Sequence, residues 1–131
     1  MIHPTALVES QQIGQDTNVW AFAHVMPGAV IGCNVNIGDH AFVESGAKIG
    51  DNVTLKNHVC VWDGITIEAD VFVGPNVTFT NDKCPRSPRA PHARQRYASR
   101  DSWLTTTRVA PGCSIGAAAT ILPGIDLGAF C

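Results

Sequence analysis

Large apolar residues recur at every sixth position along most of the chain. The series runs without a miss from Ile13 to Phe79, and it resumes in the same phase from Val109 to Leu127. A period of six fits neither the 3.6-residue turn of an α-helix nor the two-residue alternation of a strand. It fits a short strand and a corner repeated three times in a triangular coil of 18 residues, with successive coils stacked about 4.8 Å apart.

Two further positions of the hexad support this interpretation. The fifth residue is mostly small or β-branched, from Thr17 to Val77, and the second is often glycine, as at Gly14 and Gly50. Glycine suits a corner that needs an unusual backbone angle. One coil cannot bury its own apolar side, so stability must come from stacking. We therefore predict an all-β fold, a parallel β-helix forming a single domain over residues 1–131.

The repeat is interrupted at about residues 83–107. Residues 84–94 read Cys-Pro-Arg-Ser-Pro-Arg-Ala-Pro-His-Ala-Arg, and proline removes a donor from a strand ladder. We predict one long excursion loop at this point. Loops of this length are usually functional or disordered, and we favour a functional role.

Composition narrows the classes of function. The net charge is −2 with 15% charged residues, and the basic residues cluster only in the loop, which argues against nucleic acid as a partner. No apolar run approaches the roughly 18 residues of a membrane span. The N-terminus lacks the basic start and long apolar stretch of a signal peptide. We therefore expect a cytoplasmic protein without a membrane partner.

The five cysteines do not predict a disulfide framework or a zinc site. Their number is odd and no Cys-x-x-Cys pair occurs, which argues against both structural disulfides and a zinc knuckle. Reduced, partly buried thiols are the expected state, and no bound metal is predicted.

Coil geometry converts sequence spacing into proximity, because residues one full coil apart should lie one above the other. His40, His58 and Asn76 form one predicted column. The segments 62–64 (Trp-Asp-Gly) and 80–82 (Thr-Asn-Asp) should be neighbours, beside Glu44, where the loop departs. Polar side chains, an aromatic ring and a basic loop converge there, which makes this corner the candidate site.

Several of these residues have equally simple structural explanations. Asn76 is more readily a corner residue that satisfies backbone groups, and His58 could be either a corner residue or a functional one. Trp20 and Phe22 lie off the inward column and could pack between subunits. The loop arginines could serve solubility or could bind a nucleotide diphosphate.

The most specific motifs are Val-Trp-Asp-Gly at 61–64, Phe-Thr-Asn-Asp at 79–82 and Pro-Arg-Ser at 85–87. With them, nearly the whole chain resembles the bacterial nucleotide-sugar N-acetyltransferases, which act on UDP- or dTDP-linked 3-amino sugars. The resemblance implies a left-handed β-helix, an exception to the usual right-handed crossover. It also implies a homotrimer with active sites between subunits, and acetyl-CoA as co-substrate in the groove between β-helices.

The resemblance further implies that Asn81 holds the sugar amine. The expected catalytic residues are Asn81, Asp63 and His58, the expected substrate-binding residues are His40, Trp62, Asp82 and Arg86, and the expected CoA-binding residues are Gly116, Ala117 and Ala119. Two departures from the family pattern stand out. Pro88 replaces a frequent lysine, and the chain to Cys131 is expected to lack the family's C-terminal coils and cap.

The expected reaction is direct acetyl transfer from acetyl-CoA to the amine of a nucleotide-linked 3-amino sugar, used in surface polysaccharide biosynthesis. The chemistry mainly needs the amine held against the thioester carbonyl, and Asp63, His58, His40 or the departing CoA thiolate could accept the amine proton. One alternative is a truncated, non-catalytic trimeric β-helix. Another is a zinc hydratase similar to γ-class carbonic anhydrase, although the spacings of His24, His40 and His58 do not resemble that family's arrangement.

Overall fold

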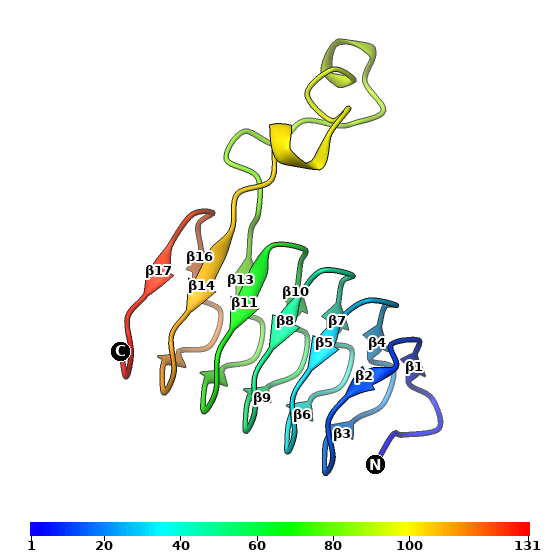
Figure 1. Ribbon diagram of the computed structural model, residues 1–131, viewed down its shortest axis with the longest axis vertical. Helices are drawn as coiled ribbons and strands as arrows, with labels where there is room; N and C mark the ends of the chain where they lie inside the picture. The colour runs from blue at the N-terminus through cyan, green and yellow to red at the C-terminus, as the bar shows by residue number, and fades with distance from the viewer.

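The computed structural model describes all 131 residues and has the predicted architecture, a left-handed parallel β-helix of three sheets (Figure 1). The chain passes through sheets I, II and III in turn, and all strand pairs within the sheets are parallel. Sheet I consists of β1 (Leu7–Val8), β4 (His24–Val25), β7 (Phe42–Val43), β10 (Cys60–Val61), β13 (Thr78–Phe79) and β16 (Thr120–Ile121).

The other two sheets complete each coil. Sheet II consists of β2 (Gln12–Ile13), β5 (Val30–Ile31), β8 (Lys48–Ile49), β11 (Ile65–Ile67), β14 (Thr107–Val109) and β17 (Asp126–Leu127). Sheet III consists of β3 (Asn18–Val19), β6 (Asn36–Ile37), β9 (Thr54–Leu55), β12 (Phe72–Val73) and β15 (Ser114–Ile115). The short strands reflect the hexad, in which strand residues alternate with a corner.

The predicted inward column forms the core. Its members from Val19 to Phe79 are at most 3% exposed, and with the fifth-position residues they belong to one cluster of 24 buried side chains. Burial becomes incomplete toward the two ends, where Ile13 and Leu127 are half-buried because each packs against a coil on one side only. The core is therefore continuous along the axis rather than concentrated at one point.

The second-position glycines have a different cause from the unusual backbone angle that the sequence predicts. Gly14 and Gly50 are not among the residues with positive φ. A Cβ on Gly14 would instead lie 2.5 Å from the backbone nitrogen of Cys33, and one on Gly50 would lie 2.9 Å from that of Ala69. These positions need glycine because the next coil approaches too closely for a side chain.

The left-handed backbone angles occur at another corner position and are adopted mostly by non-glycine residues. Between sheets III and I they form the predicted column of His40 (φ 58°), His58 (φ 63°) and Asn76 (φ 61°), which begins with Phe22 (φ 58°). The rings of His40 and His58 stack at 5.2 Å and 5°. Asn, Asp and His tolerate this conformation better than most residues, so the polar columns are partly a backbone requirement.

The excursion loop leaves the helix after β13 and returns at β14, as predicted, and it projects from the body (Figure 1). It is an ordered structure with two short 3₁₀ helices, Pro91–Ala93 and Arg100–Ser102. The rings of Tyr97 and Trp103 lie 5.7 Å apart within it, and Asp82 and Leu104 pair at its base. No helix in the chain is long and apolar enough to span a lipid bilayer.

The coil register continues in phase across the loop. Below the loop, Ile49 pairs with Ile67, which is the next inward residue of the same sheet. Across it, Ile67 pairs with Val109 in the same parallel register, although the loop lies between them in the sequence. Both partners belong to the inward six-residue series, so the loop lengthens one coil by a whole number of hexads and preserves the phase of the repeat.

Whether a side chain points into the coil or out of it should determine how much stability is lost when it is shortened to alanine. Leu55 is fully buried, whereas Leu122 is 62% exposed. We expect Leu55→Ala to lower the free energy of unfolding by about 2–5 kcal/mol, and Leu122→Ala to change it by less than about 0.5 kcal/mol. Equilibrium unfolding in urea measures both, and equal effects would contradict the assignment of the inward column.

Candidate functional site

The corner between sheets I and II brings the two predicted segments together. The Asn81 side-chain amide donates a hydrogen bond to the Asp63 carbonyl oxygen at 3.1 Å. The Trp62 indole N–H donates to the Phe79 carbonyl oxygen at 2.9 Å. The adjacency predicted from the coil spacing is confirmed, and the catalytic and binding roles of these residues remain predictions.

Asp63 is held by the excursion loop. Arg100 donates to both carboxylate oxygens, from Nε at 2.6 Å and from Nη2 at 2.7 Å. This hydrogen bonding from Arg100 lowers the pKa of Asp63 despite its partial burial. A carboxylate with a lowered pKa is a poor proton acceptor. The contacts of Asp63 therefore suit it to anchor the loop and to orient Asn81 through its carbonyl oxygen.

Asp82 fixes the base of the same loop. Its carboxylate accepts hydrogen bonds from the Tyr97 hydroxyl at 2.7 Å and from the Cys84 N–H at 2.9 Å, and it forms a close ion pair with Arg96. Burial raises the pKa of Asp82, but the hydrogen bonds from Tyr97, Cys84 and Arg96 outweigh it and lower the pKa. All these contacts of Asp82 are with the loop, and its predicted substrate-binding role remains a prediction.

The two histidines lie at a different corner. His40 and His58 occupy the turn between sheets III and I and are exposed. His58 precedes strand β10 and Asp63 follows it, so the two residues lie at opposite ends of this strand, at most about 16 Å of extended chain apart. Within one chain the structure therefore does not gather the three predicted catalytic residues. Asn81 and Asp63 share one corner, and His58 with His40 shares another.

The outer face of sheet I connects these corners and carries aromatic rings. The Phe42 ring lies 5.6 Å from the Trp62 ring and 5.3 Å from the His24 ring. Cys60 lies beside Phe42 in the register of the sheet. Burial raises the pKa of the Cys60 thiol, so it is a weak nucleophile.

Arg86 lies in the projecting loop and is exposed. Its backbone N–H donates to the Tyr97 hydroxyl at 2.7 Å, and its guanidinium donates to the Pro85 carbonyl oxygen at 2.8 Å. Arg89 and Arg94 are also exposed and form no ion pair. These side chains leave cationic donors free on the loop surface.

The predicted CoA-binding residues continue the histidine corner rather than the Asn81 corner. Ala118, between Ala117 and Ala119, has a φ of 61° and donates its N–H to the Pro75 carbonyl oxygen one coil below. Gly116 and Ala117 are exposed, and a Cβ on Gly116 would meet no atom within 4 Å. Small residues therefore leave this part of the surface open.

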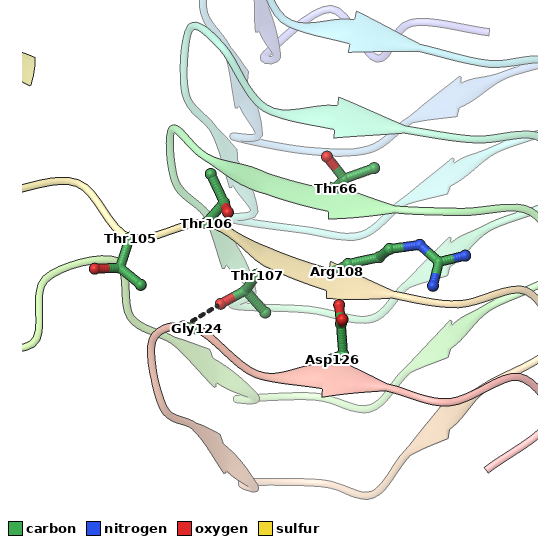
Figure 2. A pocket seen from close by; sticks show the side chains of 7 residues that line it. All are labelled: Thr66, Thr105, Thr106, Thr107, Arg108, Gly124 and Asp126. Atoms are coloured by element: carbon green, nitrogen blue, oxygen red, sulfur yellow. Dashed lines mark hydrogen bonds between the residues drawn. The ribbon is translucent and has the colours of Figure 1, made fainter. Parts of the chain in front are cut away.

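A hollow that the sequence does not predict lies on sheet II beside the Asn81 corner (Figure 2). Its volume is about 540 Å³, and it is lined by Thr66, Thr105, Thr106, Thr107, Arg108, Gly124 and Asp126. The Thr105 N–H donates to the Asn81 carbonyl oxygen at 2.9 Å, which joins its wall to the candidate site. In the sequence, the only feature that could have pointed to this hollow is the run of three threonines, 105–107, where the repeat resumes.

The chain brings no three His, Cys, Asp or Glu side chains together as a metal site. His24 instead lies 2.6 Å from the Glu9 carboxylate, and His40 stacks between Phe22 and His58.

A coiled stack of six-residue repeats defines the class of hexapeptide-repeat β-helix proteins. The family model described as bacterial transferase hexapeptide (six repeats) matches residues 12–45 and 46–81, together more than half of the chain. The chain belongs to this family.

One curated relative extends the comparison over a short stretch. A 31-residue segment is 52% identical to the dTDP-3-amino-3,6-dideoxy-alpha-D-galactopyranose 3-N-acetyltransferase of Aneurinibacillus thermoaerophilus. The segment makes up 24% of this chain and 16% of the relative's length. The match supports the acetyltransferase resemblance over that segment.

The Asp63–Arg100 pair should control how firmly the loop is held. We expect Asp63→Asn and Arg100→Gln each to speed chymotryptic cleavage within the loop severalfold. The double variant should be little worse than either, because both substitutions remove the same interaction. Glu9→Gln, remote from the loop, is the control. Additive effects would show that the two side chains act separately.

The same pair should make the stability of the loop depend on pH. Since the pKa of Asp63 is lowered in the folded chain, the stabilisation by the pair is complete at neutral pH. This stabilisation is lost as the pH falls through the folded-state pKa.

Proposed function

We propose that this protein transfers an acetyl group from acetyl-CoA to the amine of a nucleotide-linked 3-amino sugar. The observation that carries the proposal is the Asn81 amide, fixed over Asp63 at the base of the ordered loop. Membership of a transferase family and the segment shared with an amino-sugar N-acetyltransferase support it. The proposed setting is surface polysaccharide biosynthesis in the cytoplasm.

The reaction requires little covalent chemistry from the protein. The amine nitrogen attacks the thioester carbonyl carbon, the C–N bond forms, and the C–S bond breaks to release CoA as thiolate. The side-chain nitrogen of Asn81 donates to the backbone carbonyl oxygen of Asp63. The side-chain oxygen of Asn81 is then left to accept a hydrogen bond from the substrate amine. Orientation of this kind contributes several kcal/mol, with about 7–11 kcal/mol as the ceiling.

The proton released from the amine needs another acceptor, because Arg100 engages Asp63. An imidazole is the side chain best suited to this role near neutral pH. His58 and its neighbour His40 lie on the opposite corner of the same coils, so one chain does not complete the site. We therefore propose a homotrimer in which the histidine corner of one subunit faces the Asn81 corner of the next.

The remaining predicted residues fit this assembly. Trp62 lies at the Asn81 corner and Arg86 lies in the loop that extends from it. Both would contact the nucleotide sugar, and Asp82 would contribute by holding the loop. Gly116, Ala117 and Ala119 border the histidine corner, where their small side chains leave room for the extended CoA chain.

Acetyl-CoA consumption with UDP- and dTDP-linked 3-amino sugars tests the proposal directly. Free thiol is read with a chromogenic reagent and corrected for the five cysteines of the chain. Turnover would establish the class and identify the nucleotide. A folded trimer that consumes no acetyl-CoA would instead support a non-catalytic β-helix.

Asn81 should matter to turnover and not to assembly. We expect Asn81→Ala to lower kcat by about 10²-fold, the usual cost of losing an orienting contact, with an unchanged mass by light scattering. Asn18→Ala, several coils away, serves as the matched control. Wild-type turnover by Asn81→Ala would place the site elsewhere.

A further inference from the structure

The hollow on sheet II offers unused hydrogen-bonding capacity. The hydroxyls of Thr66, Thr105 and Thr106 form no hydrogen bond within the chain. Thr107 differs, because its hydroxyl accepts the Gly124 N–H at 3.2 Å and so shapes the wall (Figure 2). Three free hydroxyls on one concave surface can each donate one hydrogen bond and accept others.

Of the two charged residues that line the hollow, one has an ion-pair partner and the other has none. Arg108 extends along β14 away from Thr105 (Figure 2), and its guanidinium lies 2.6 Å from the Glu68 carboxylate. Asp126 is the register partner of Arg108 in β17 but forms no ion pair or hydrogen bond. The hollow therefore presents one free carboxylate, which accepts hydrogen bonds from hydroxyl or amine groups.

No apolar side chain lines the hollow. Sites for acyl chains and flat aromatic bases are lined mainly by apolar and aromatic residues. The lining instead matches a compact ligand with several hydroxyls, and the volume of about 540 Å³ is large enough for a sugar ring.

The side chain of Lys83 lies at the edge of the hollow. A Cβ on Gly124 would lie 3.4 Å from Cε and 3.7 Å from Nζ of Lys83, so the lysine side chain crosses over this glycine. Lys83 forms no ion pair within the chain. An exposed ammonium group beside a polar hollow is suited to bind a phosphate.

We propose, building on the function proposed above, that the hollow binds the sugar ring of the nucleotide-linked substrate. The free threonine hydroxyls and Asp126 hold the ring, and Lys83 contacts the diphosphate. The wall of the hollow is bonded through Thr105 to Asn81, so a sugar bound here lies next to the residue proposed to orient its amine.

Three variants test the hollow by steady-state kinetics, with dTDP-linked 3-amino-3,6-dideoxygalactose and its UDP counterpart as probes. We expect Thr66→Val, Asp126→Asn and Lys83→Ala each to raise KM for the nucleotide sugar about tenfold with little change in kcat, because they remove binding rather than chemistry. Thr54→Val is the matched control, since Thr54 faces outward from sheet III and forms no hydrogen bond through its hydroxyl. Unfolding midpoints check that every variant is folded.

Saturation-transfer NMR with the same probes separates this proposal from the proposed function. Loss of the sugar-ring signals in the hollow variants, but not in Thr54→Val, supports the hollow even if the wild-type protein transfers no acetyl group. Normal turnover with unchanged KM and unchanged ring signals in all three variants overturns the hollow and leaves the proposed function standing. Absence of sugar binding to the wild-type protein overturns it as well.

Discussion

The hydrogen-bonded stacking of each coil on the next is the constraint on which the rest of the structure depends. Backbone N–H groups donate to carbonyl oxygens of the following coil with a regular offset, as from Gly14 to Ile31 at 2.9 Å and from Gly32 to Ile49 at 2.8 Å. This offset places like hexad positions above one another. It builds the aliphatic core on the inside and the polar columns on the corners, so stability and site geometry have one origin.

The excursion loop is compatible with this constraint because the chain re-enters sheet II in the register in which it left. Ile67 pairs with Ile49 on one side and with Val109 on the other, so the insertion leaves the inward column in phase. The loop then needs its own attachments. Asp63 and Asp82 provide them through Arg100, Arg96 and Tyr97, which converts a proline- and arginine-rich segment into an ordered extension of the corner.

The periodicity of the sequence predicted the contacts between residues one regular coil apart. It did not predict contacts that involve the inserted loop or that lie across it. The contact of Asn81 with Asp63 follows directly from the spacing of one coil, as does the stacking of His40 on His58. The hollow did not follow, because Thr66 meets Arg108 only after the inserted residues are counted. The Asp63–Arg100 pair was also missed, because the loop has no repeat from which a contact could be derived.

The distribution of charge explains which partners the acidic residues at the corner have. Six of the nine lysines and arginines lie in residues 83–107, which contain one acid, Asp101. Asp63 and Asp82 each neutralise one of these arginines and thereby have lowered pKa values. Lys83, Arg86, Arg89 and Arg94 remain without carboxylate partners. The corner thus combines a fixed amide, two carboxylates already paired with arginines, and free cations. This is the combination on which the proposed binding of an anionic nucleotide sugar, with proton transfer to another group, depends.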